Sequence, residues 1–161
     1  PNTLPQRWEA SGLQRSKGVD MDFFYALTPD WQLMANATFL DAYYVSDGNA
    51  ALNGTKLNSV PDWAWAAWTK YTLSHGPLKG LSVGGGAVSR GRTFVYGEIY
   101  PTLISPSFTR FDLLVSYAFK AAEHPIELSV KLNNVFDKVY MDASRGFGEP
   151  RGVLTSLTIG F

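Results

Sequence analysis

The 161-residue sequence has no cysteine. It therefore cannot form a disulfide scaffold, a thiolate metal site or a cysteine nucleophile. Charged residues are also scarce: they make up 17% of the sequence, against about 25% in an average soluble domain. The 14 Lys and Arg residues balance the 14 Asp and Glu residues. Because this balance gives no basic footprint, the composition argues against nucleic acid as a partner.

Long hydrophobic runs are missing as well. No stretch of about 18 apolar residues is present, so the sequence offers no transmembrane helix. Hydrophobic residues still make up 45% of the chain and aromatic residues 14%, which excludes a disordered coil. The length suits about one domain, and β-barrel membrane proteins remain compatible with this composition.

Apolar and polar residues alternate along most of the chain, which is the period of a β-strand whose two faces meet different surroundings. Val19, Met21 and Phe23, for example, alternate with Asp20 and Asp22. The sequence therefore predicts an all-β protein. Its expected strands cover residues 13–27, 31–45, 63–73, 81–90, 107–119, 126–133 and 153–161.

The connections between these strands alternate in length. Short, breaker-rich turns are expected at 28–30, 74–77 and 121–125, and long loops at 46–61, 91–105 and 137–150. An antiparallel up-and-down sheet with tight turns on one rim and long loops on the other produces this alternation. A sandwich with Greek-key crossings has no reason to produce it.

The strand lengths and faces favour a transmembrane β-barrel. Several predicted strands exceed the usual five or six residues and reach the roughly 9–11 residues that cross a bilayer. One alternate set is almost free of charge and is expected to face lipid, while the opposite, polar set is expected to face the lumen. The alternative is a soluble β-sandwich whose apolar face is its core. The charged residues expected to face the lumen are Asp20, Asp22, Lys70, Arg110, Asp112, Lys120, Glu127 and Lys131.

Five motifs occur in an order that resembles one family. They are Gln14–Asp20, Val60-Pro61 with Trp68–Tyr71, Arg110–Leu113, Leu132–Tyr140 and Gly148–Arg151, and they are followed by an aromatic last residue, Phe161. Together they cover nearly the whole chain. The sequence resembles the TonB-dependent outer-membrane receptors, particularly the siderophore-receptor branch.

The resemblance implies a barrel of 22 strands filled by an amino-terminal plug domain. We expect residues 1–161 to be the carboxy-terminal portion of that barrel, about its last seven strands, with the plug and its TonB box absent from this chain. The start at Pro1, with no initiator Met or signal-peptide pattern, fits a processed chain or a piece of a longer one.

The resemblance also implies a function. We expect a receptor in the outer membrane of a Gram-negative bacterium, which takes up ferric siderophores with energy from the TonB–ExbB–ExbD complex through the missing amino-terminal part. Another cargo, such as a corrinoid or an oligosaccharide, is the alternative, and a soluble β-sandwich binding module is a third. The siderophore would hold the iron, so neither a metal site nor a bound cofactor is expected.

Catalysis finds little support in the residues present. His75 and His124 fall in predicted short turns and not beside a nucleophile. The glycine run 84–86 lacks the Lys-Ser/Thr and the helix of a phosphate loop, and we expect it to permit curvature or close approach of a plug. The protein is therefore not predicted to be an enzyme.

The long loops carry the candidate ligand-binding residues. Ferric siderophores are bulky, partly aromatic and often anionic, so aromatic stacking and arginine contacts would suit them. Alternatively, these aromatic residues only pack the loops or extend an aromatic girdle. The predicted ligand-binding residues are Arg92, Phe94, Tyr96, Tyr100, Arg145 and Phe147.

Overall fold

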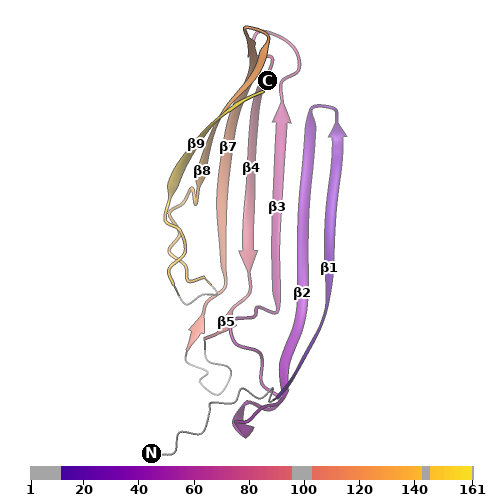
Figure 1. The fold of residues 1–161 in the computed structure, drawn as a ribbon, viewed down its shortest axis with the longest axis vertical. Helices are drawn as coiled ribbons and strands as arrows, with labels where there is room; N and C mark the ends of the chain where they lie inside the picture. Colours follow the sequence, from indigo (N-terminus) through magenta and orange to yellow (C-terminus); the bar gives the residue numbers. More distant parts are fainter. Residues whose placement is uncertain (1–11, 96–102, 143–145, 161) are drawn as a thin grey trace, which may run out of the picture.

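The structure, a computed structural model, describes residues 12–95, 103–142 and 146–160. Within these residues no helix is long and apolar enough to cross a membrane. The described elements are β1 (Leu13–Thr28), β2 (Trp31–Ser46), a 3-10 turn η1 (Ala50–Leu52), β3 (Trp63–Thr72), β4 (Leu81–Arg90), β5 (Thr93–Phe94), β6 (Ile104–Ser105), β7 (Phe108–Ala121), β8 (His124–Asn133) and β9 (Gly152–Ile159) (Figure 1).

Seven long strands form one antiparallel sheet in the order β1-β2-β3-β4-β7-β8-β9. Each of them pairs with its neighbour along the chain, apart from the small β5–β6 ribbon inserted between β4 and β7. The predicted all-β, up-and-down architecture is confirmed. The ribbon was not predicted, because two-residue strands carry no recognisable period.

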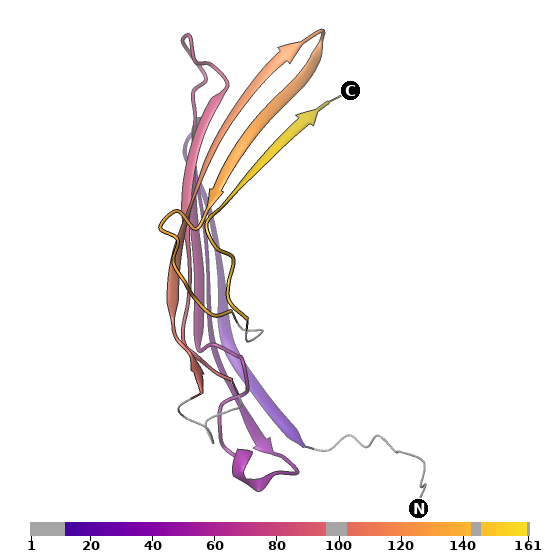
Figure 2. The same ribbon diagram turned by 90° about the vertical axis from the view of Figure 1, so that its left-hand side faces the viewer.

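The connections follow the predicted alternation. The three short ones lie at one end of the sheet and the long loops 47–62, 91–107 and 134–151 extend toward the other (Figures 1 and 2). The β7–β8 turn uses Ala122 and Glu123 at φ 49° and 70°, the left-handed pair that matches the strand twist in a two-residue hairpin. The β3–β4 connection covers 73–80 and is longer than predicted.

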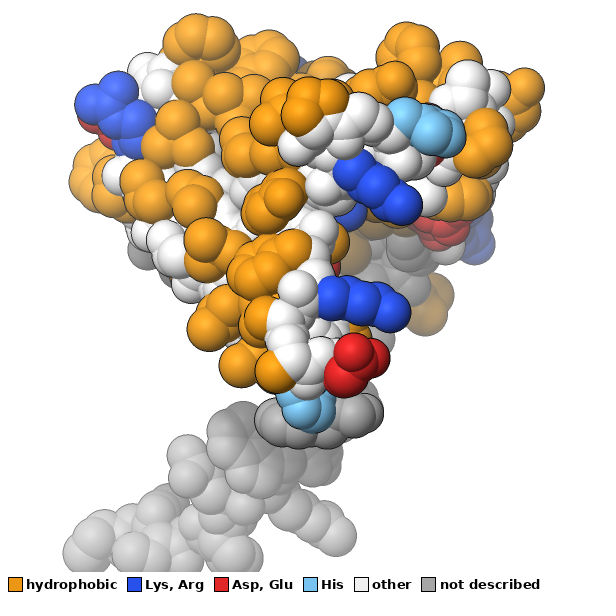
Figure 3. Space-filling model, turned by 90° about the horizontal axis from the view of Figure 1, so that it is seen from above, with side chains coloured by type: hydrophobic (Ala, Val, Ile, Leu, Met, Phe, Trp, Pro, Cys, Tyr) orange, Lys and Arg blue, Asp and Glu red, His pale blue; other side chains and the backbone are white. Residues whose placement is uncertain are grey.

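Every second residue along each long strand belongs to the apolar face of the sheet. On this face, between the Val19–Phe39 pair and the short turns, the described residues include no Asp, Glu, Lys or Arg. Many of its large side chains are exposed, and they dominate the convex side of the curved wall seen end-on (Figure 3). They include Val19, Met21, Phe23, Tyr25, Phe39, Trp65, Tyr71, Val83, Phe111, Leu113, Val115, Tyr117, Phe119, Leu128, Val130, Leu157 and Ile159.

The polar face lies on the opposite, concave side. All eight charged residues predicted to face the lumen are at positions of this face. Trp68 lies across the glycine run on this face, since a Cβ added to Gly86 would stand 2.0 Å from the Trp68 ring. The room beside Gly86 is thus taken by an indole of the same sheet, which the sequence did not reveal.

Candidate functional site

The β5–β6 ribbon holds the central long loop at the loop end of the sheet. Thr93 pairs with Ser105 and Phe94 with Ile104. Thr93 and Ser105 are each 2% exposed, so the ribbon is packed against its surroundings on that side. The backbone N–H of Ser59, in loop 47–62, donates to the Phe94 carbonyl at 2.9 Å. The ribbon is therefore joined to the neighbouring loop.

Arg92 and Phe94 are brought together by this ribbon. They flank buried Thr93, so the alternation of an extended chain places them on the same side. The guanidinium carbon of Arg92 lies 5.6 Å from the centre of the Phe94 ring, which is within cation–π range. The pair offers a flat, positively charged surface that suits an anionic, partly aromatic ligand.

The other four predicted residues are less defined. Tyr96, Tyr100 and Arg145 lie outside the described residues. Phe147 is 81% exposed and forms a bridge to Met141 within loop 134–151, so this ring is displayed and not packed inside the loop. Among the described contacts, none joins Phe147 to Arg92 or Phe94.

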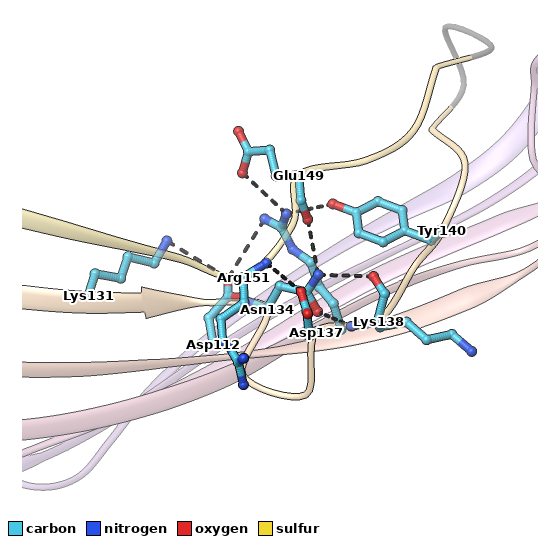
Figure 4. A network of polar contacts seen from close by, with 9 residues as sticks. Asp112, Lys131, Asn134, Asp137, Lys138, Tyr140, Glu149 and Arg151 are labelled. Carbon is cyan, nitrogen blue, oxygen red and sulfur yellow. Dashed lines mark hydrogen bonds and ion pairs between the residues drawn. The ribbon is translucent and has the colours of Figure 1, made fainter.

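Asn134 closes the base of loop 134–151 (Figure 4). Its side chain is fully buried and donates to the carbonyls of Lys138 and Glu149 at 3.0 Å each, while its oxygen accepts the Lys138 N–H at 2.8 Å. Its backbone N–H donates to Asp112 at 2.9 Å. Both ends of the loop thus meet on one amide.

A charged network continues from Asp112 on the polar face (Figure 4). Asp112 is 4% exposed and lies 3.7 Å from Arg110 and 3.9 Å from Lys131. Arg110 also donates to the Tyr140 hydroxyl at 2.8 Å and lies 3.6 Å from Glu149. These predicted lumen charges therefore pair with one another and with loop 134–151.

A second charged cluster lies on the same side of β1 and β2 as the apolar face. It begins at the next residue pair on that side after Val19–Phe39, toward the long loops. Lys56 contacts Asp41 and Asp62 at 2.8 Å each, and Lys17 lies 3.7 Å from Asp41. The hydrogen bonds to Asp41 and then Asp62 raise the pKa of Lys56. This cluster attaches loop 47–62 to the sheet at the level where the apolar surface ends.

His75 lies in the β3–β4 connection as predicted, whereas His124, predicted in a turn, is the first residue of β8. His124 Nδ1 is 3.1 Å from the Gly160 carbonyl. Ser74 hydrogen-bonds to both Asp30 and His75 at 2.8 Å, but the serine stands in the middle of this trio, whereas a catalytic triad needs the imidazole there. Among the described residues, no group of three His, Cys, Asp or Glu could hold a metal.

Comparison with known proteins identifies similar sequences. The sequence profile of the family described as "TonB dependent receptor-like, beta-barrel" matches residues 1–135. The probable TonB-dependent siderophore receptor PiuA of Acinetobacter baumannii is 27% identical over 98% of this chain and 22% of its own length. The metal-pseudopaline receptor CntO of Pseudomonas aeruginosa is 29% identical over the same shares. The ferrichrome outer membrane transporter/phage receptor of Escherichia coli is 28% identical over 91% of this chain and 20% of its own length.

Solved receptor structures contain a region with the same fold as this sheet. The crystal structure of the siderophore receptor PiuA superposes with a TM-score of 0.70 at 26% identity, covering 92% of this chain and 22% of that one. The ferric preacinetobactin receptor BauA, also from Acinetobacter baumannii, gives 0.80 at 22% identity over 91% and 22%, a likeness of fold. The chain thus spans about a fifth of the length of these three relatives.

Proposed function

The chain belongs to the TonB-dependent receptor β-barrel family, and we propose that the whole protein is a receptor that takes up ferric siderophores. Its strands lie in the bacterial outer membrane, as in the family and its relatives. Relatives bear the names of receptors for ferrichrome, ferric pyoverdine and ferrioxamine B, which supports a metal chelate as the cargo. The protein's task is transport and not catalysis.

One observation carries the membrane assignment: the charge-free apolar face runs across all seven strands. In water an exposed apolar surface of this extent would aggregate, but on a barrel it is the surface that lipid covers. The soluble sandwich alternative required a second sheet over this face. Within the described residues the seven strands form a single layer, so that alternative is discarded.

We propose that residues 1–161 form the carboxy-terminal arc of the barrel wall and that the plug domain belongs to another part of the protein. In the described sheet, β1 and β9 each pair with one strand only. Lipid cannot satisfy the free edge of a strand, so further strands of the whole barrel must flank both. TonB dependence implies a TonB partner, and ExbB and ExbD complete the proposed coupling complex, which acts through the plug side.

We propose that Arg92 and Phe94 contact the ferric siderophore from the central long loop. The two side chains form a cation–π pair at 5.6 Å. Arg92 is exposed and Phe94 half-buried, and β5 lies at the end of the sheet to which the long loops extend (Figure 1). The sequence adds Tyr96, Tyr100, Arg145 and Phe147 to the proposed contacts. The siderophore supplies every ligand to the iron, and the protein supplies stacking surface and positive charge.

Equilibrium binding by the purified full-length receptor tests this proposal. We expect at least one of ferrichrome, ferrioxamine B, ferric pyoverdine and metal-pseudopaline to bind. Arg92→Ala and Phe94→Ala should each weaken that binding about tenfold, which is about 1.4 kcal/mol. Each variant removes one member of the stacked pair, and with it that side chain's contact with the ligand.

Lys138→Ala is the matched control, since Lys138 is an exposed loop cation whose described hydrogen bonds use its backbone. It should leave affinity unchanged. Binding of a corrinoid or an oligosaccharide in place of every chelate would favour the alternative cargo. Unchanged affinity in both variants would remove this loop from the site.

A further inference from the structure

Arg90, the last residue of β4, reaches two of the long loops. Its guanidinium donates to the Ser105 hydroxyl at 3.3 Å and to the carbonyl of Met141. The Ser105 hydroxyl donates to the same carbonyl at 3.1 Å. Ser105 belongs to β6 and Met141 to loop 134–151, so side chains from β4 and β6 converge on one backbone oxygen of another loop.

Aromatic rings hold the guanidinium in place. Its central carbon lies 5.2 Å from the centre of the Phe108 ring, and Phe108 stacks on Tyr140 at 4.1 Å between ring centres. Tyr140 precedes Met141, so two contacts hold the Met141 carbonyl in place: the hydrogen bond from Arg90 and the stacking of the preceding Tyr140 ring on Phe108. A planar fork that stacks and donates at once is a property of arginine that lysine does not share.

The third long loop joins the same chain of contacts. Ser59 in loop 47–62 donates to Phe94 in β5, β5 pairs with β6, and Ser105 in β6 bonds to Met141. The three loops are therefore linked in series through the ribbon that carries Arg92 and Phe94. The link to loop 134–151 runs through Arg90 and Ser105.

We propose that Arg90 is a positioning residue that locks the long loops into one unit and so holds Arg92 and Phe94 ready for the ligand. It acts through the backbone of loop 134–151 and not by touching the siderophore. A ligand surface that is ordered before binding avoids the entropy cost of ordering loops during binding. The locking itself needs no ligand, whereas its effect on affinity rests on the proposed function.

The locking is tested first without ligand, in the full-length receptor. Ala51 and Val139, both exposed, are replaced by cysteine and spin-labelled, so that the labels report the distance between loops 47–62 and 134–151. Residues 1–161 contain no native cysteine, and any native cysteine in the rest of the full-length receptor is replaced. Arg90→Gln should at least double the width of the distance distribution, with Ser105→Ala and Arg90→Lys intermediate. Arg151→Gln is the control, since exposed Arg151 hydrogen-bonds through its backbone N–H. Unchanged widths in a heat-modifiable, folded Arg90→Gln barrel would overturn the proposal.

Affinity for the same chelates (ferrichrome, ferrioxamine B, ferric pyoverdine and metal-pseudopaline) separates positioning from a merely structural role. Arg90→Gln should weaken binding at least fivefold, Arg90→Lys should restore part of it, and Arg90→Gln combined with Arg92→Ala should lose less than the product of the two single losses. Fully multiplicative losses would overturn the positioning role. If none of the chelates binds, the proposed function fails, and the width of the label distances alone decides whether Arg90 locks the loops.

Discussion

Asn134 shows how a single side chain can close a long loop. Its backbone has φ 51°, a left-handed conformation that asparagine tolerates better than most residues. That conformation turns the chain out of β8, while the amide binds backbone groups of Lys138 and Glu149. Because the amide is fully buried, each lost partner would leave a backbone group without compensation.

We expect Asn134→Ala to loosen loop 134–151. Three hydrogen bonds of about 1 kcal/mol each are lost, so local opening should become easier by about 2–3 kcal/mol. That corresponds to about 30- to 160-fold faster protease nicking of the loop when cleavage follows the open population.

Two neighbouring changes test the cause. Asn134→Gly relieves the positive φ but loses the same bonds, and it should nick nearly as fast as Asn134→Ala. Asn133→Ala removes the same amide one position earlier, where no described hydrogen bond of the side chain is lost, and should nick slowly. Equal nicking of Asn133→Ala and Asn134→Ala would refute the assigned role.

Each long strand presents different chemistry to its two sides, and the register brings like side chains together. Val83, Val115 and Val130 form one cross-strand row on the apolar face, and Ser82, Ser116 and Ser129 form a row on the polar face. Alternation alone treats Ser116 and Ser129 as equivalent. Ser116 is only 2% exposed, so Arg substituted there would be crowded, and Ser129 is the sound control.

Arginine substituted at Val115 or Leu128 in the full-length receptor should destabilise the barrel by about 2–4 kcal/mol if the site is near the bilayer midplane. Both side chains are exposed on the apolar face, where lipid cannot solvate a guanidinium. Urea unfolding in lipid vesicles measures the loss. Ser129→Arg should cost far less, and equal losses on the two faces would argue against lipid on the apolar face.

The fold was predictable from the sequence because its information is local. A period of two residues assigns each strand and both of its faces, as for Asp20 and Asp22 opposite Val19 and Met21. The stacking of Arg92 on Phe94 was not predictable in this way, because the short β5–β6 ribbon that places both residues on one side carries no recognisable period. The length of the β3–β4 connection was not predictable either, because its Gly76 and Gly80 mark turns without fixing where the strands end.

The contacts that organise the loops could not be predicted in this way. Arg90 and Met141 are 51 residues apart, and Arg110 and Tyr140 are 30 apart. No period links such positions, and only the register of β4, β7 and β8 brings them together. Asn134 had a signal, the Asn-Asn doublet at a strand end, but its partners Lys138 and Glu149 become evident only in three dimensions.

If residues 1–161 are an arc of a larger barrel, as proposed, the sheet as a whole depends on strands beyond β1 and β9, the edges of the described sheet. Expressed alone, residues 1–161 should therefore aggregate and fail to form a stable monomeric barrel, because unpaired edges template association with other chains. Gel mobility before and after heating, together with protease resistance in detergent, measures this, with the full-length receptor as the positive control. A heat-modifiable, protease-resistant monomer of residues 1–161 would contradict the open-arc description.

Iron accumulation in living cells tests the proposed transport most directly. The measurement compares ⁵⁵Fe uptake from the chelate that binds best, in a strain without other ferric-siderophore receptors, with and without this protein and with and without TonB. Uptake should require both proteins and fall to background when either is missing. Uptake that persists without this receptor, or that continues at full rate without TonB, would contradict a TonB-dependent siderophore receptor.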